Sequence, residues 1–331
     1  MSKLLIYPYT EEHEYFLKHS SMIVDFELTS IVTDKGYSAN SKIIRWANLP
    51  KHFVISTSLY DDACKCDGIL YLSKAEDNEC INTLPNIDKK KFLKFERKKI
   101  DNNTLNDITK DKKMRLMNIP IITVYGQGEN TQKFDIQLDL RARLIEDGYR
   151  VLSFGTKDYS GIFGMEVLPD YSNLPLWKKV LFINEYVYSF ARKDNPDVII
   201  LGVPGGIMPA NKVDFQYFGE DSLALTMAIE PDITILSVYE NLASYETISE
   251  TEKFFKYRLG AKLDIVHVSN TRYMPQENKN PIYLRVKESH VFNRINKLSR
   301  THKSFICSDC EKSKAVYSRI IEKLSSNVPV V

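Results

Sequence analysis

Residues 119–144, which read IPIITVYGQGENTQKFDIQLDLRARL, decide the fold of this chain. The β-branched and aromatic run 121–125 predicts a buried strand, and Gly126 and Gly128 follow it in a turn. From residue 134 the apolar positions recur at helical spacing, at Phe134, Leu138, Leu140 and Leu144, with Asp135, Asp139, Arg141 and Arg143 largely outside that face. A strand, a glycine turn and a helix in this order present backbone N–H groups and a helix N-terminus to a phosphate.

The turn resembles a phosphate-binding P-loop, with Lys133 at the loop tip in the place of the phosphate-reaching lysine. A P-loop has glycine before this lysine, and serine or threonine after it to hold magnesium. Gln132 and Phe134 stand in those places. Two interpretations follow: a degenerate P-loop that binds ATP or another nucleotide, with or without Mg²⁺, or an ordinary β–Gly–α turn in a parallel sheet.

The composition predicts a globular protein of about two domains, because the 331 residues are 43% apolar and 27% charged. The net charge of +2 argues against a nucleic-acid partner, which would require a basic excess. The N-terminal segment MSKLLIYPYTEEHEYF has too short an apolar run for a signal peptide or a membrane span. We therefore expect a cytoplasmic protein with no membrane partner and with reduced cysteines.

Residues 1–87 predict a Rossmann-like N-terminal domain, because strand-like and helix-like segments alternate. The expected strands are 3–7, 27–33, 53–57 and 68–72, and no G-x-G-x-x-G turn follows the first of them. Residues 88–118 are a basic connector. Its first half predicts a solvated helix that buries Phe92, Leu93 and Phe95 and ends at Asn102, and an acidic peptide or a nucleic acid is the alternative partner for its lysines.

Residues 119–331 predict a P-loop-like α/β domain with a C-terminal helix over 312–324, so the fold class is α/β with two Rossmann-like open parallel sheets. Further strands are expected at 150–154, 198–201, 232–238 and 263–268. In such a sheet the ligand lies beyond the carboxyl ends of the strands. The candidate cofactor-binding residues are Gly126, Gly128, Thr131, Lys133, Asp135, Thr156, Lys157 and Asp158, with Asn241, Asn270 and Arg272 as further polar groups.

The sequence assigns no catalytic residue. A working ATPase places a carboxylate at the end of a strand to hold magnesium, but Gly202 follows Ile200 and Leu201 here. Asp135 or Asp158 could take that role, or could cap a helix. The departures at the loop and at the strand end both indicate weak or absent hydrolysis.

The cysteines form two short-spaced pairs, Cys64 with Cys66 and Cys307 with Cys310, and Cys80 stands apart. Four thiolates brought together could hold zinc or an iron–sulfur cluster, whereas ordinary reduced thiols are the alternative that we favour. Cys307 precedes the C-terminal helix, and a helix start would lower its pKa, which makes it the better redox candidate.

Four blocks carry a family resemblance: residues 126–133, GYRVLSFGTKDYSGI at 148–162, DVIILGVPGGIMPAN at 197–211, and GEDSLALTMAIEPDITILSVYEN at 219–241. Their order resembles bacterial proteins with a Rossmann-like N-terminal domain and a P-loop C-terminal domain, one branch of which contains a D-glutamate N-acetyltransferase. That family carries a strand-end glutamate and Gly-Lys in the loop, and this sequence has neither. This sequence more closely resembles peptide maturation system proteins, which are encoded beside radical-SAM enzymes in cassettes for ribosomally made natural products.

The resemblance implies a nucleotide-binding protein in the maturation of a ribosomally synthesised peptide, with a precursor peptide or a radical-SAM maturation enzyme as its partner. The alternative is a non-catalytic partner or scaffold protein that kept the P-loop fold and lost its chemistry. The acetyltransferase branch implies a third possibility, an acyltransferase.

Overall fold

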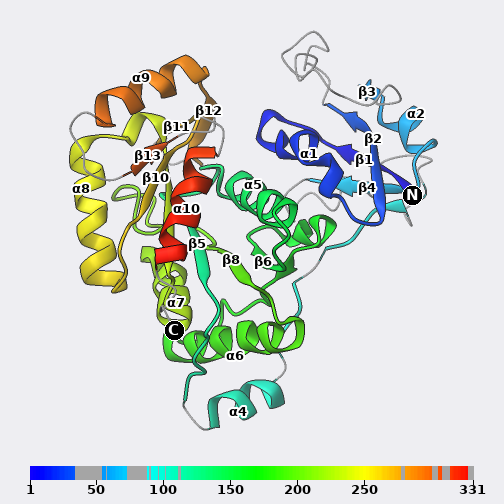
Figure 1. Cartoon of the computed structure of the whole chain (residues 1–331). Coiled ribbons are helices and arrows are strands. Elements are labelled where there is room, and N and C mark those ends of the chain that lie inside the picture. Colours follow the sequence, from blue (N-terminus) through cyan, green and yellow to red (C-terminus); the bar gives the residue numbers. More distant parts are fainter. Residues whose placement is uncertain are drawn as a thin grey trace. The chain divides into compact units, whose positions relative to one another are not determined.

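The structure is a computed structural model that describes residues 1–33, 54–56, 58–72, 88, 91–95, 97–100, 102–110, 113–276, 280–299, 305–307 and 314–326. The chain forms two compact units (Figure 1). The first comprises residues 1–96 with 161–164, and the second comprises residues 97–160 with 165–331. In the described part of the chain, no helix combines the length and the apolar character needed to cross a membrane.

The first unit is built on a four-stranded parallel sheet in the order β3-β2-β1-β4. Its strands are β1 (Ser2–Tyr7), β2 (Phe26–Val32), β3 (Val54–Ser56) and β4 (Gly68–Tyr71), and its helices are α1 (Tyr15–Lys18) and α2 (Leu59–Ala63). The four strands match those expected from the sequence. Leu5, Val32 and Ile69 belong to the apolar core of this sheet, because alternate residues of each strand face the covering helices.

The expected helix in the first half of the basic connector is wrong. Phe92 is buried, but it lies beside β4 in a parallel bridge to Ile69, in extended rather than helical backbone. A helix does form further along, as α4 (Asn102–Lys110), where the asparagines were expected to end one. α4 packs on α6 (Leu176–Asp194), so tertiary packing compensates for its weak helix propensity.

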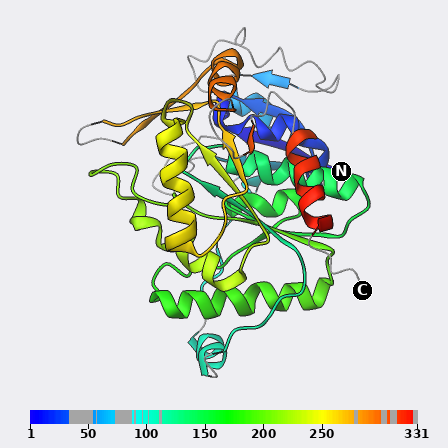
Figure 2. The ribbon, with the colours of Figure 1, turned by 60° about the vertical axis from the view of Figure 1, so that its left-hand side comes forward.

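The second unit contains a seven-stranded parallel sheet in the order β13-β10-β9-β5-β8-β6-β7 (Figures 1 and 2). The strands are β5 (Ile121–Gly126), β6 (Val151–Gly155), β7 (Glu166–Val167), β8 (Val198–Gly202), β9 (Ile233–Val238), β10 (Ile265–Val268) and β13 (Phe305–Cys307). The helices besides α4 and α6 are α5 (Lys133–Glu146), α7 (Glu220–Ile229), α8 (Tyr245–Phe254), α9 (Glu288–Ser299) and α10 (Lys314–Ser326). This confirms the predicted α/β class with two open parallel sheets.

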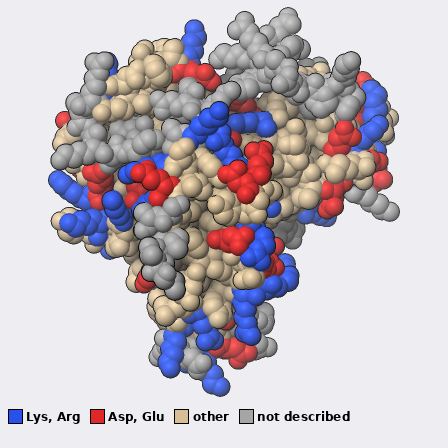
Figure 3. Space-filling view, viewed as in Figure 1, with Lys and Arg blue, Asp and Glu red and all other residues tan. Residues whose placement is uncertain are grey.

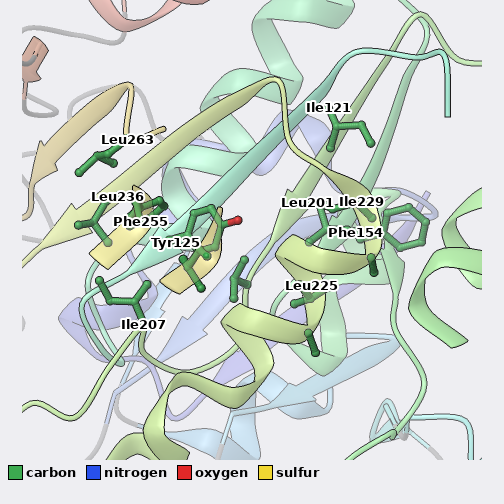
Figure 4. Packing of buried hydrophobic residues seen from close by; sticks show 14 of the residues in the cluster. Ile121, Tyr125, Phe154, Leu201, Ile207, Leu225, Ile229, Leu236, Phe255 and Leu263 are labelled. Carbon is green, nitrogen blue, oxygen red and sulfur yellow. The ribbon is translucent and has the colours of Figure 1, made fainter. Parts of the chain in front are cut away.

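Both faces of the second sheet are covered, and β5 lies near its middle. Ile122 and Val124 pack with α5 and α10, which lie side by side in Figures 1 and 2. Ile121 and Tyr125 point to the opposite face, into a core that α6, α7 and α9 share (Figure 4). Because successive side chains of a strand point to opposite faces, a continuous apolar strand such as β5 must be buried on both. A smaller antiparallel sheet, β11 (Thr271–Met274) and β12 (Ile282–Arg285), follows β10.

Positive and negative side chains are interspersed on the molecular face shown in Figure 3. The formal net charge of the sequence is only +2, so neither sign dominates. No extended basic surface is visible on that face of the described residues, and such a surface is the usual footprint of a protein that binds nucleic acid.

Candidate phosphate-binding site

The loop between β5 and α5 is closed tightly on itself. A Cβ atom built on Gly126 would lie 2.5 Å from Thr131 Oγ1 and 2.6 Å from Lys133 Cδ, so only glycine fits there. Thr131 Oγ1 donates a hydrogen bond to the carbonyl of Gly128 at 3.1 Å. Gln132 takes a left-handed conformation, with φ of 59°, and α5 begins at the next residue. Four of the predicted site residues, Gly126, Gly128, Thr131 and Lys133, therefore form one compact turn at the N-terminus of a helix.

Lys133 is not at an exposed loop tip, as the sequence suggested, because it is the first residue of α5 and only 8% exposed. Its Nζ donates to the carbonyl of Val203 at 3.0 Å and to that of Gly205. Burial, together with the positive charge of Lys157, lowers the pKa of Lys133 to about 7, and the negative charge of Glu129 opposes this shift. The buried ammonium group thus lies at the carboxyl end of β8, beside the turn that follows β6.

The loop is also fastened to the ends of β9 and β10. Ser237 Oγ donates to the carbonyl of Thr131 and lies 2.8 Å from His267 Nδ1, and both side chains are buried. Gln132 Oε1 accepts a hydrogen bond from the backbone N–H of Asn270 at 2.8 Å. Sequence reasoning missed Ser237 and His267, because nothing in their local pattern connects two strands to a loop more than a hundred residues away.

Tyr239 contacts the loop and belongs to a group of three stacked tyrosines. Tyr239 donates from its hydroxyl to the carbonyl of Glu129 at 2.5 Å, and its ring stacks on Tyr273 and Tyr283 at centroid distances of 5.1 and 6.0 Å. A Cβ atom on Gly128 would lie 2.4 Å from the Tyr239 hydroxyl. Tyr239 directly follows β9, whereas Tyr273 lies in β11 and Tyr283 in β12.

The other predicted site residues lie either in the turn after β6 or in the first turn of α5. Lys157 lies close enough to Lys133 to affect its pKa. Asp158 forms an ion pair with Arg97 at 2.6 Å, and Arg97 also donates to the carbonyl of Thr156 at 3.3 Å. Asp135, expected outside the apolar face of its helix, is buried in the first turn of α5. The turn after β6 therefore contributes to the site through Lys157, while Asp158 already has a cationic partner.

Two of the additional polar candidates hold neighbouring structure together. Asn241 exchanges side-chain hydrogen bonds with the backbone of Tyr273 at 2.9 and 3.0 Å. Arg272 pairs with the buried Glu240 through two hydrogen bonds, at 2.7 and 3.1 Å. Both side chains therefore anchor β11 beside the end of β9.

The side chains at the magnesium positions do not fit that ion. Phe134, in the place of the serine or threonine, is buried and has no oxygen ligand to offer. At the strand end, a Cβ atom on Gly202 would lie 2.3 Å from Gln137 Oε1, so the space of a strand-end carboxylate is filled by an amide. Neither position supplies the charged oxygen that Mg²⁺ prefers.

The cysteines give no support to a metal centre within the described residues, where no group of three or more metal-ligating side chains occurs. Cys64 is exposed, Cys66 is buried with its pKa raised by that burial, and Cys307 is buried in β13 with its thiol against the carbonyl of Val266. Cys80 and Cys310 lie outside the described residues. Only 1% of Cys307 is exposed, and this burial argues against the redox role that the sequence suggested for it.

The parallel sheet and the glycine loop before α5 define the second unit as an open-sheet α/β domain with a P-loop-like turn between β5 and α5. The sequence matches no family model and no curated protein. The structure is similar to the crystal structure of a DUF1611 family protein from Anabaena variabilis, with a TM-score of 0.63 and 9% identity, over 97% of this chain and 100% of that one. Similarity at this identity establishes the fold.

Two nucleotide complexes show lower similarity. A putative plasmid partition protein from Borrelia burgdorferi, bound to AMPPNP, matches with a TM-score of 0.39 and 12% identity, over 64% of this chain and 100% of that one. A nucleotide-binding protein from Archaeoglobus fulgidus in complex with ADP matches with a TM-score of 0.33 and 13% identity, over 68% and 94% of the two chains.

Proposed function

We propose that the loop at residues 126–133 binds the phosphate groups of a nucleotide. The observation that carries this proposal is the position of Lys133, a lysine buried at the first turn of α5 behind a closed glycine loop. The N-terminus of a helix carries a partial positive charge and unpaired N–H groups, and a lysine there adds a full charge. Lys157 supplies a second cation from the turn after β6.

A phosphate would also give Lys133 a stronger hydrogen-bond acceptor than the backbone carbonyls that it contacts in the ligand-free protein. Lys133 now shares its protons with two backbone carbonyls, which carry only partial negative charge. A phosphate oxygen is a stronger, charged acceptor, and such hydrogen bonds are about twice as strong as neutral ones. Binding therefore exchanges two carbonyl contacts of Lys133 for a contact with an anion.

The biological role that we propose for this site is the maturation of a ribosomally synthesised peptide. Its support is the resemblance of the four sequence blocks at 126–133, 148–162, 197–211 and 219–241 to peptide maturation system proteins. A precursor peptide or a radical-SAM maturation enzyme is the partner implied by that resemblance. Acyl transfer, implied by the acetyltransferase branch, would use the same loop for the phosphates of acetyl-CoA.

Calorimetric titration with ATP, ADP, GTP and acetyl-CoA tests the proposal. We expect at least one to bind with Kd below about 1 mM, near −4 kcal/mol. Lys133→Met should weaken that binding about 10- to 150-fold, the equivalent of 1.5–3 kcal/mol for a hydrogen bond to a charged group. Lys193→Ala is the matched control, because Lys193 is exposed in the last turn of α6, which leads into the opposite end of β8. Absence of binding by all four ligands would refute the proposal.

A second candidate function is a partner protein that holds the precursor peptide or the maturation enzyme, and the segment 213–218 favours it. Its Val213, Phe215, Tyr217 and Phe218 are exposed, and the Phe215 ring lies 5.4 and 5.5 Å from those of Tyr217 and Phe218. Residues 216–218 are all left-handed, a conformation that costs non-glycine residues about 1–2 kcal/mol each. An exposed apolar cluster on a strained segment is typical of a docking surface.

Fluorescence anisotropy with a fluorescently labelled candidate precursor peptide tests this second function. The double variant Tyr217→Ser, Phe218→Ser should lose peptide binding while keeping nucleotide binding, because both side chains point to solvent. Trp177→Ser is the matched control, since Trp177 is also an exposed aromatic residue but lies in α6. Equal loss in the control would show non-specific adhesion instead of docking.

A further inference from the structure

Gln137 occupies the place where a hydrolytic P-loop protein has its strand-end carboxylate. It lies one helical turn after Lys133 on the same face of α5, and it is 0% exposed. Its Nε2 donates to the carbonyl of Phe154 at 2.8 Å, which fixes the orientation of the amide and directs Oε1 toward Gly202. Gln137 and Gly202 are therefore complementary, because the amide fills the space that a side chain at position 202 would need.

The Oε1 atom of Gln137 receives no hydrogen bond from any described residue. A buried acceptor without a donor is costly and is therefore uncommon away from functional sites. The atom lies at the carboxyl end of β8, the strand end from which Val203 accepts its hydrogen bond from Lys133. The orphaned amide thus faces the same region as the buried lysine, and it is neutral where a magnesium site would be negative.

Two lysine side chains supply positive charge at this site, as a bound metal ion would. Lys133 and Lys157 lie close enough to repel one another, and Glu129 only partly offsets that repulsion. Asp158, the carboxylate nearest in sequence to Lys157, is paired with Arg97. A site with two lysines and no free strand-end carboxylate attracts an anion and repels a divalent cation.

We propose that this site binds a phosphorylated ligand in its metal-free form, with Lys133 and Lys157 neutralising the phosphates in place of Mg²⁺ and Gln137 in the position of the metal-binding carboxylate. The proposal rests on the function proposed above and specifies its ligand as a free nucleotide, bound and not hydrolysed. A neutral amide cannot hold Mg²⁺ as a carboxylate does, so added metal gains no charged ligand at the end of β8.

Titration with ADP, once in EDTA and once in excess MgCl₂, tests the proposal. Affinity in MgCl₂ should equal that in EDTA or be weaker, because Mg²⁺ sequesters free ADP. Lys157→Ala should weaken binding about 10-fold or more, and Mg²⁺ should not restore it. Lys193→Ala again serves as the control. Binding that is at least about 10-fold tighter with Mg²⁺ overturns this inference and leaves the proposed function intact. Absence of binding by ADP, ATP, GTP and acetyl-CoA in both solutions overturns both.

The proposed exchange of a carboxylate at position 202 for the amide of Gln137 can also be tested by its effect on stability. Gly202→Asp alone should lower the midpoint of unfolding, because its Cβ would meet the amide at 2.3 Å. Gln137→Ala in the same chain should recover part of that loss, since it empties the space. ADP binding by the double variant should then become stronger with Mg²⁺. Additive destabilisation by the two substitutions would contradict the proposed exchange.

Discussion

The affinity of the loop for a phosphate should fall as the pH rises from 6.5 to 8.5. In the ligand-free protein the pKa of Lys133 is about 7, mainly because the side chain is buried and also because Lys157 is near. A bound phosphate favours the ammonium form, so it raises the pKa of Lys133 back toward its ordinary value. At any pH at which Lys133 is neutral in the ligand-free protein, phosphate binding must then take up a proton. A neutral amine keeps two N–H bonds, so it can still contact both carbonyls.

The size of this effect follows from the protonated fraction of free Lys133. With a pKa of about 7, about 76% of the side chain is charged at pH 6.5 and about 3% at pH 8.5. Because only the charged form binds the phosphate well, the affinity should fall roughly 25-fold, which is about 1.9 kcal/mol. At pH 8, binding should take up about 0.9 proton from the buffer.

Calorimetry with ADP at pH 6.5, 7.5 and 8.5 measures both quantities, with the proton uptake taken from buffers of different ionisation enthalpy. Each titration is repeated with Lys133→Met, because the ionisation of ADP itself affects both proteins equally and cancels in the ratio of their affinities. That ratio should shrink about 25-fold across the range. A constant ratio, or binding without proton uptake at pH 8, would refute the account of Lys133.

Three further outcomes are expected. In urea unfolding without ligand, the stability of the wild type relative to Lys133→Met should rise by about 2 kcal/mol from pH 7 to 9. The reason is that the unfolded chain binds more protons than the folded one in this range. A fall in the relative stability would contradict the lowered pKa of Lys133. Ser237→Ala should cost about 1–3 kcal/mol of stability, because it removes the hydroxyl that contacts His267 Nδ1 and the carbonyl of Thr131. A loss under about 0.5 kcal/mol would show that water replaces the hydroxyl. Gly128→Ala should weaken ADP binding, because the added methyl group would lie 2.4 Å from the Tyr239 hydroxyl, and Tyr239→Phe in the same chain should restore part of the affinity. No recovery would show that the strain lies elsewhere.

Except for the short strands β7 and β13, the strands of the two parallel sheets could be predicted from sequence, as could the glycine loop, because their signals are local. The run 121–125 is continuously apolar, and it forms the central β5, buried on both faces. Side chains alternate between the two faces of that strand, and Thr131 and Lys133 approach Gly126 closely. Both features involve residues only a few positions apart in the sequence. The class of the fold follows from the alternation of such runs with helical segments.

Where local signals conflict with packing, the sequence misleads. Asn102 and Asn103 have weak helix propensity, yet α4 forms there because it packs on α6. Phe92 has an apolar pattern that suits a helix, but its partner is Ile69 in the neighbouring strand. In both cases a contact with a distant residue outweighs a preference of a few tenths of a kcal/mol to about 1 kcal/mol per residue.

The sequence by itself determined that a lysine stands between a glycine turn and a helix, and that the usual residues on either side of it and at the end of β8 are missing. Only the tertiary structure decided what those departures mean. The sheet order places β8 and β9 on either side of β5, which brings the carbonyl of Val203 to Lys133, Gln137 to Gly202 and Ser237 to the loop. These contacts join residues about 65 to 106 positions apart, and no local pattern encodes them, because they arise only when separate strands pair.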